Sequence, residues 1–159
     1  IINVAPGGQE LASAPAEVLS TVLGSCVAAC LRDHATGLGG MNHFLLPGDA
    51  PGAATMPGSE DMRFGVTAME LLINALLKRG AVRSRLEAKV FGGATMLIEN
   101  AGASVGSRNA SFVLAFLARE GIPVLAQDLG GSMPRRANYE PATGRAWVNH
   151  LGQPRAESI

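Results

Sequence analysis

A cysteine and a histidine in the first third of the chain have the types and the spacing for covalent chemistry. Cys26 ends the segment Gly24-Ser25-Cys26, and His43 follows it by 17 residues. A free thiol has a pKa of about 8.5 and is a poor nucleophile until a neighbouring histidine stabilises the thiolate. With that neighbour, Cys26 would attack a carbonyl carbon, His43 would protonate the leaving group, and backbone N–H groups at Ser25 and Cys26 would receive the oxyanion. The pair is the minimum equipment for acyl transfer.

The same two residues also have interpretations without catalysis. Cys26 begins the apolar run 26–31, where a cysteine is commonly a small buried hydrophobic side chain. His43 stands beside Phe44, as a structural histidine would. A redox-sensing or metal-binding thiol protein would instead use Cys26 together with Cys30. The residue types alone leave these alternatives open.

Two short strands are expected to bring the pair together. The apolar run 26–31 and the segment 41–46, which stops at Pro47-Gly48, are separated by a glycine-rich turn signal. Paired as a hairpin, they place Cys26 and His43 on neighbouring elements. The run of Pro, Gly and Ala from 48 to 59 predicts an exposed loop near them.

The rest of the chain predicts a layered fold of helices and strands. Apolar residues recur at helical spacing in some segments and alternate with polar residues in others. We expect an α/β fold of the α+β kind, in which mixed and antiparallel sheets are layered with two main helices, as a single domain spanning 1–159. The expected helices are 64–79 and 108–120, the second capped by Ser107, and the expected strands are 86–90, 122–126 and a hairpin around 141–144.

Charge and hydropathy exclude several classes of function. The 13 Lys and Arg residues balance the 13 Asp and Glu residues, so no basic excess indicates nucleic-acid binding. The longest uninterrupted apolar run, 26–31, is far shorter than the roughly 18 residues of a membrane-spanning helix. The start of the chain has no basic segment followed by an apolar one, as a secretory signal would. We therefore expect a cytoplasmic protein with no membrane insertion.

No cofactor or metal is expected. Cys26, Cys30, His34 and His43 lack the usual zinc spacings. The Gly-Gly pairs at 92–93 and 130–131 lack the strand, glycine loop and helix pattern of a nucleotide site, and they predict turns. With two cysteines in all, free thiols are expected rather than a disulfide framework.

Five segments together resemble the CheD family, the chemoreceptor glutamine deamidases of bacterial chemotaxis. The resemblance extends over essentially the whole chain in the family's order, and the Gly-Ser-Cys and Met-Asn-His blocks are its most specific parts. It implies a cysteine hydrolase, a protein-glutamine glutaminase that converts receptor glutamine side chains to glutamate and releases ammonia. It also implies a fold similar to the deamidase domains of certain bacterial toxins. The segments are 21–31, 39–47, 90–94, 106–109 and 121–131.

The resemblance assigns roles to individual residues. The family's nucleophile falls on Cys26 and its general base on His43. The family commonly has a threonine hydroxyl six residues before the cysteine that orients the imidazole; this spacing favours Ser20, while the residue type keeps Thr21 open. On a strand these two side chains point to opposite faces, so only one of them orients the ring. Gly24, Ser25 and Asn42 are expected at the substrate and oxyanion side of the site.

The resemblance also implies partners. The substrate would be the cytoplasmic helices of chemoreceptors, and some family members bind a CheC-type phosphatase. A glutamine side chain is a neutral amide, so its hydrolysis requires a nucleophile, a proton donor and an oxyanion pocket but no cofactor. The alternative is a non-catalytic chemotaxis adaptor that docks on receptors or on such a phosphatase.

Overall fold

Two five-stranded sheets and two α-helices make up the described part of the chain. The computed structural model describes residues 1–48, 59–95, 104–152 and 157–159. Sheet A has the strand order β1-β3-β8-β9-β10, and sheet B has the order β2-β5-β4-β6-β7. The elements are β1 (Ile2–Asn3), β2 (Gln9–Ala12), β3 (Leu19–Leu23), β4 (Val27–Asp33), β5 (Gly39–Asn42), α1 (Glu60–Lys78), the 3₁₀ turn η2 (Arg83–Arg85), β6 (Leu86–Gly92), α2 (Val105–Arg119), β7 (Val124–Leu129), β8 (Arg135–Glu140), β9 (Arg145–His150) and β10 (Glu157–Ser158).

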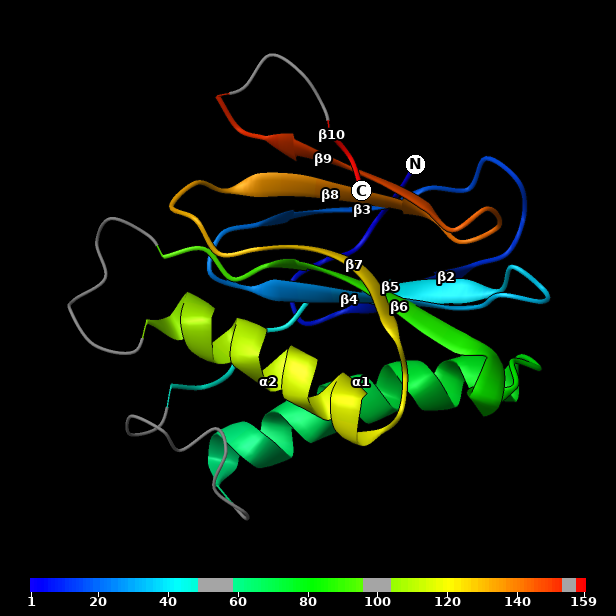
Figure 1. Cartoon of the computed structure of the whole chain (residues 1–159), viewed down its shortest axis with the longest axis horizontal. Coiled ribbons are helices and arrows are strands. Elements are labelled where there is room, and N and C mark those ends of the chain that lie inside the picture. The colour runs from blue at the N-terminus through cyan, green and yellow to red at the C-terminus, as the bar shows by residue number, and fades with distance from the viewer. Residues whose placement is uncertain (49–58, 96–103, 153–156) are drawn as a thin grey trace.

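The sheets and helices form three layers. Figure 1 shows sheet A above sheet B, with α1 and α2 side by side below sheet B. Sheet B is mixed, since β7 runs parallel to β6 while its other pairs are antiparallel. The predicted α+β class with layered mixed sheets and two main helices is confirmed. No helix within the described ranges is long and apolar enough to cross a membrane.

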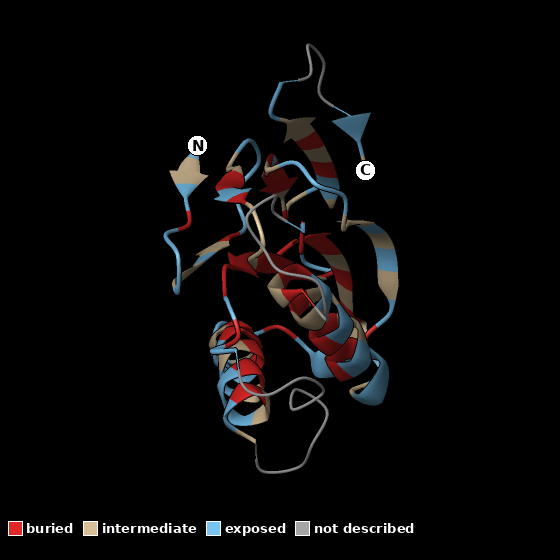
Figure 2. Ribbon diagram, turned by 90° about the vertical axis from the view of Figure 1, so that its left-hand side faces the viewer, coloured by how far each residue is buried: buried red, intermediate tan, exposed pale blue. Residues whose placement is uncertain are grey.

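Two hydrophobic cores separate the layers. One lies between sheet B and the helices and includes Val27, Phe44 and Leu46. The other lies between the two sheets and includes Leu19 and Leu23, with Cys26 packed against it. Because alternate residues of a strand face opposite sides, the central strands β4 and β6 contribute to both cores. Figure 2 shows the corresponding buried stripe and exposed side on each helix.

The helix ends follow their capping residues. Ser59 Oγ accepts from Met62 N at the start of α1, and Gly80, with φ of 104°, follows the last turn. The second helix begins earlier than expected because Ser104, not Ser107, is its cap: Ser104 Oγ accepts from Ser107 N at 3.0 Å. Ser104 and Ser107 have the same capping chemistry, and the path of the backbone makes Ser104 the cap.

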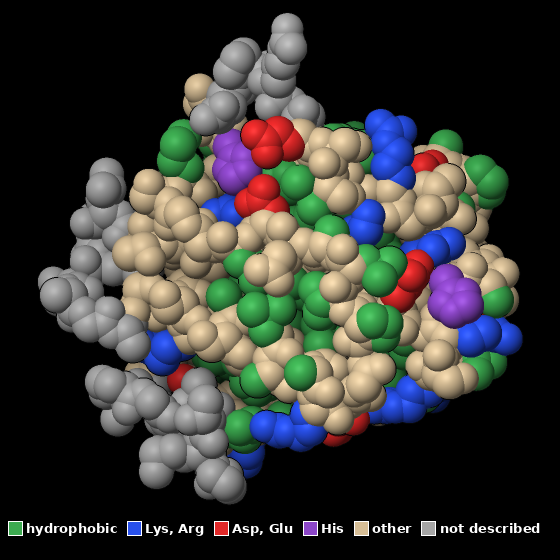
Figure 3. Space-filling view, in the orientation of Figure 1, with side chains coloured by type: hydrophobic (Ala, Val, Ile, Leu, Met, Phe, Trp, Pro, Cys, Tyr) green, Lys and Arg blue, Asp and Glu red, His purple; other side chains and the backbone are tan. Residues whose placement is uncertain are grey.

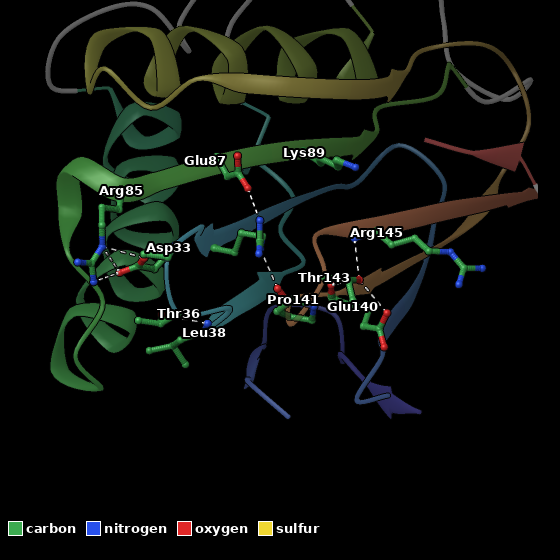
Figure 4. Close-up of polar contacts among 12 residues, drawn as sticks. Asp33, Thr36, Leu38, Arg85, Glu87, Lys89, Glu140, Pro141, Thr143 and Arg145 are labelled. Carbon is green, nitrogen blue, oxygen red and sulfur yellow. Dashed lines mark hydrogen bonds and ion pairs between the residues drawn. The ribbon is translucent and has the colours of Figure 1, made fainter. Parts of the chain in front are cut away.

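Arginine side chains tie the edges of the layers together. Arg32 on β4 binds Glu87 on β6 and donates through Nε to Pro141 O in the β8–β9 turn at 2.8 Å. Asp33, fully buried, accepts from Arg85 Nε and Nη2, as Figure 4 shows. These contacts fix the end of β4 opposite to the end that carries Cys26.

The expected hairpin is present with different limits. β4 and β5 pair antiparallel, with Cys30 opposite Met41, but Cys26 precedes β4 instead of starting it. The end of the chain is paired where it is described: β10 pairs with β9, and Lys89 Nζ donates to Ile159 O at 2.7 Å. The expected loop at 48–59 lies largely outside the described residues.

Candidate active site

Cys26 lies in a short loop between β3 and β4 whose carbonyl groups are held by the end of β6. Gly93 N donates to Cys26 O at 2.8 Å, and Ala94 N donates to Gly24 O at 3.0 Å. Within the described residues, the N–H groups of Ser25 and Cys26 have no backbone acceptor. The loop is therefore fixed through its carbonyl oxygens, which leaves two amide donors beside the sulfur.

Gly92 allows β6 to approach this loop closely. Its φ is 106°, and a Cβ there would lie 2.2 Å from Cys26 O. No side chain fits in that space, and residues other than glycine rarely adopt that φ. The glycine pair that predicts a turn therefore also supports the cysteine loop.

The strand register places His43 on the same face as Cys26. Val27 and Phe44 form a bridge in which each N–H donates to the other's carbonyl, at 3.0 and 2.9 Å. Both side chains belong to the core under the helices. Cys26 and His43 each precede a member of this bridge, so their side chains point to the opposite face, toward sheet A. They are diagonal neighbours, a relationship with Cα atoms about 7–8 Å apart and within reach of larger side chains.

Thr21 holds the imidazole of His43 from across the gap between the sheets. Thr21 Oγ1 lies 2.7 Å from His43 Nδ1 and donates to Val4 O at 2.8 Å. A hydroxyl has one proton to donate, and Val4 O receives it, so Thr21 must accept from His43 Nδ1–H. In the neutral ring Nε2 then carries the lone pair. Since Nε2 has no partner among the described residues, it is free to accept a proton.

Ser20, which the spacing favours for this role, points the other way. Ser20 Oγ donates to Asn138 Oδ1 at 2.9 Å on the outer face of sheet A. Thr21 lies on the same face of β3 as Leu19 and Leu23, which belong to the core between the sheets. The preference for Ser20 is wrong, and the alternative kept open on residue type is the one that contacts His43.

Burial opposes the charged forms of both side chains of the pair. It raises the pKa of the Cys26 thiol above its ordinary value, and it lowers the pKa of the His43 imidazole below its ordinary value. At neutral pH the favoured state is a thiol beside a neutral imidazole. From this state, attack by the sulfur requires a base that takes the thiol proton. A preformed pair of thiolate and imidazolium is not the favoured state.

Asn42 does not face the pair. Its side chain points to the helix side of β5, where Oδ1 accepts from Ala29 N at 2.8 Å and Nδ2 donates to Ala68 O at 3.4 Å. Neighbouring residues of a strand point to opposite faces, so the Asn42 carboxamide lies on the helix side of β5 while His43 faces sheet A, although both residues line one pocket. These contacts do not support the expected oxyanion role for Asn42; its carboxamide ties β5 to β4 and α1.

Asn109 on α2 was not singled out as a site residue, yet it contacts the cysteine loop. It is fully buried, its Nδ2 donates to Ser25 O at 2.8 Å, and its Oδ1 accepts from Leu46 N at 3.0 Å. The one sequence signal is its place in the segment Gly106-Ser-Arg-Asn. Nothing in that segment indicates which two distant strands the carboxamide would join.

A pocket of about 250 Å³ borders His43. It lies between the start of β2 and α1 and includes His43 but not Cys26 in its lining. Phe64 and Leu71 line it and remain about half exposed, at 46% and 57%. The pocket offers apolar contact beside His43 to a partner that lies against α1.

One further group within the described residues has metal-binding side chains. Ligand atoms of Asp128, His150 and Glu157 lie within 4.8 Å of one another. Asp128 already binds Arg135 through Oδ1 and His150 Nε2 through Oδ2, the latter at 3.1 Å. Because a buried guanidinium neutralises Asp128, ion pairing accounts for this group.

Comparison with known proteins decides the family. The family model described as "CheD chemotactic sensory transduction" matches residues 45–150. The chain belongs to the CheD family. This match begins after Cys26 and His43, so the CheD model by itself does not assign the pair.

Curated CheD relatives match a larger share of the chain. Proteins named "Probable chemoreceptor glutamine deamidase CheD" are 54% identical over 94% of this chain in Bordetella petrii and 57% identical over 84% in Cupriavidus pinatubonensis. The matches cover 66% and 62% of those proteins, so the chain spans about two thirds of their length. The corresponding protein of Rhizobium etli is 52% identical, over 91% of this chain and 77% of its own.

A comparison of solved structures gives a weak similarity. A Bacillus licheniformis protein described as hypothetical protein YfiH has a TM-score of 0.43 and 13% sequence identity, over 76% of this chain and 49% of that one. A similarity of this size carries no argument about fold or function.

Proposed function

We propose that the chain is a protein-glutamine deamidase that acts on chemoreceptor glutamine side chains through Cys26 and His43. The names of its relatives support the substrate class. The observation that carries the chemistry is the contact of Thr21 with His43 Nδ1, which leaves Nε2 as a proton acceptor on the face that Cys26 shares. The proposal treats residues 1–159 as one CheD-like domain.

The first step is attack of the thiol on the side-chain amide. Cys26 Sγ forms a bond to the amide carbon while His43 Nε2 takes the thiol proton. The oxyanion is received by the N–H groups of Ser25 and Cys26, which have no acceptor within the described backbone. His43 then gives its proton to the amide nitrogen, the C–N bond breaks, and ammonia leaves a thioester on Cys26.

The second step hydrolyses the thioester. His43 Nε2 takes a proton from water as the water oxygen bonds to the carbonyl carbon. The C–S bond breaks, the sulfur regains its proton from His43, and the product is a glutamate side chain. Throughout, Thr21 accepts from Nδ1 and stabilises the imidazolium that forms twice in the cycle.

The surface suits a protein partner that presents a neutral group. Basic and acidic side chains are interspersed on the face in Figure 3 rather than gathered by sign. A neutral amide gains little from long-range charge steering, so shape and apolar contact would select the substrate. The proposed substrate is the cytoplasmic helices of chemoreceptors, which places the chain in the cytoplasm, and a CheC-type phosphatase is its proposed second partner.

Incubation with a receptor cytoplasmic fragment tests this function. Peptide mass spectrometry should find specific glutamines converted to glutamate, together with released ammonia, and Cys26→Ala should convert none. A wild-type chain that binds the fragment and converts nothing would instead be an adaptor. Stoichiometric metal in the purified chain together with no conversion would favour a metal-binding thiol protein.

A further inference from the structure

Asn109 occupies the position of a missing rung between two strands. Val27 and Phe44 form a pair that exchanges both backbone hydrogen bonds. In an antiparallel ladder such pairs recur at every second residue, so the next pair would join Ser25 and Leu46 directly. That rung is absent from the described backbone hydrogen bonds. The Asn109 carboxamide takes its place, accepting from Leu46 N and donating to Ser25 O.

The Asn109 carboxamide lies between the backbone at Ser25 and the backbone at Leu46, and it holds these two segments apart next to Cys26. The carboxamide has the donor and acceptor of a peptide group, and both are used at 2.8 and 3.0 Å. Were the rung closed, Ser25 N would donate to Leu46 O and would be lost as an oxyanion donor. The side chain thus keeps the Ser25 N–H out of the ladder and fixes the loop that carries the thiol.

The base of α2 is built to hold Asn109 in this position. A Cβ on Gly106 would lie 2.1 Å from Ala94 O and 2.6 Å from Gly93 O, so the first turn of α2 rests directly on the turn that binds the cysteine loop. Asn109 is fully buried one helical turn later. Two contacts from the same helix therefore set the position of the loop, one through Gly93 and Ala94 and one through Asn109.

We propose that Asn109 is a positioning residue for the reaction: its carboxamide replaces the Ser25–Leu46 rung and sets Cys26 and the Ser25 amide against His43. The part concerning the oxyanion rests on the proposed deamidase function. The part concerning the thiol does not, because its readout is the reactivity of Cys26 itself.

Two substitutions separate the two halves of the carboxamide. Asn109→Leu has a similar shape and removes both hydrogen bonds. Asn109→Asp keeps an acceptor for Leu46 N, and while its carboxyl is protonated it also keeps a donor for Ser25 O. Once ionised, its carboxylate repels that carbonyl. The Asp variant should therefore approach wild-type behaviour at acid pH and lose it as the pH rises.

Ser104→Ala is the matched control. It removes the cap of the same helix and the contact of Ser104 Oγ with Thr95 Oγ1 at 3.1 Å, but it leaves both bonds of Asn109, so it reports the effect of destabilising the start of α2. For each variant we would measure kcat and KM for glutamine conversion and the rate of iodoacetamide alkylation at Cys26, located by peptide mass spectrometry. Cys30 is a built-in reference, since it is fully buried and burial raises its pKa.

The expected result is a loss in kcat with little change in KM. Asn109→Leu should lower kcat by at least about tenfold, toward the roughly hundredfold loss that removal of one oxyanion donor causes, and leave KM within about threefold. Alkylation of Cys26 should slow in the same variant. For Asn109→Asp, kcat and the alkylation rate, each divided by the wild-type value at the same pH, should fall as the pH rises. Ser104→Ala should stay close to wild type in all three.

Folded Asn109 variants that match Ser104→Ala in kcat and in alkylation at every pH would overturn the inference. Should Asn109→Leu fail to fold, the pH dependence of Asn109→Asp decides. Should the wild-type chain convert no glutamine, the proposed function fails, while alkylation of Cys26 in the same variants still supports or overturns the positioning role.

Discussion

Thr21 Oγ1 lies 2.7 Å from His43 Nδ1 and gives its own proton to Val4 O. A strand of sheet A thus fixes the tautomer of a histidine that follows β5 of sheet B. The catalytic geometry we propose depends on the separation of the two sheets, because base and nucleophile belong to one layer and the residue that orients the base belongs to the other.

Thr21→Val should reduce kcat, whereas Ser20→Ala should not. The valine removes the acceptor for Nδ1–H, and a hydrogen bond to a group that becomes charged is worth about 1.5–3 kcal/mol, or roughly tenfold to a hundredfold in rate. Thr21→Ser keeps the hydroxyl and should restore most of kcat. Steady-state kinetics of the three variants measure this, and equal losses for Ser20→Ala and Thr21→Val would contradict the assignment.

The pH profile of conversion should have its acid limb below pH 6.5. Conversion needs neutral His43, and burial holds the pKa of that imidazole below its ordinary 6.5. Since the thiol pKa is raised, no gain from a preformed thiolate is expected at neutral pH. Measuring kcat/KM from pH 5 to 8 tests this. An acid limb above pH 6.5 would show that the imidazole is stabilised in its charged form.

Gly92→Ala should damage the site as well as the fold, while Gly80→Ala should affect stability alone. Both glycines have φ near 105°, at 106° and 104°, so both substitutions strain the backbone by about 1–2 kcal/mol. Only at Gly92 does the added Cβ meet Cys26 O; at Gly80 nothing lies within 4 Å. Tm should therefore fall in both variants, whereas kcat should fall only in Gly92→Ala. An unchanged kcat in folded Gly92→Ala would argue against a role of β6 in positioning the cysteine loop.

Asn42→Ala should lower stability and leave the chemistry intact. It leaves Ala29 N without its acceptor, a buried loss of about 1–3 kcal/mol. Denaturant unfolding measures the stability, and kcat at a temperature where the variant is folded should remain within about threefold of wild type. A larger fall in kcat at full folding would return Asn42 to the reacting centre.

Asp33→Asn should lower Tm and flatten its dependence on acid pH. The Arg85 guanidinium holds the pKa of the buried Asp33 carboxyl well below its ordinary 3.8. A carboxyl with a depressed folded-state pKa contributes stability above its unfolded-state pKa and loses it as the pH falls through and below 3.8. Thermal unfolding from pH 2 to 7 compares the two chains, and parallel curves would contradict the contribution of this pair.

Periodic patterns predicted the elements, but not the contacts between layers. Both helices follow from apolar spacing over many residues, and the β4–β5 pair follows from two short segments around a glycine-rich turn. The choice between Ser20 and Thr21 depended on which face of β3 packs against sheet B. The sequence around β3 does not predict which face that is. β1 and β10 were missed because two-residue strands have no periodicity.

The site was half predictable for the same reason. Cys26 and His43 stand out as reactive types near one another in sequence, whereas Asn109 joins Ser25 from 84 positions away. Asn42 adjoins His43 in sequence, and for that reason its side chain lies on the opposite face of the strand.

The most direct test of the central claim is the conversion of receptor glutamines by Cys26→Ala and His43→Ala, with Cys30→Ala as the matched thiol control. Peptide mass spectrometry of a receptor cytoplasmic fragment measures the fraction of glutamate formed. We predict conversion by wild type and by Cys30→Ala, and none by the other two variants, with all four chains folded. Conversion retained by Cys26→Ala would contradict the proposed mechanism.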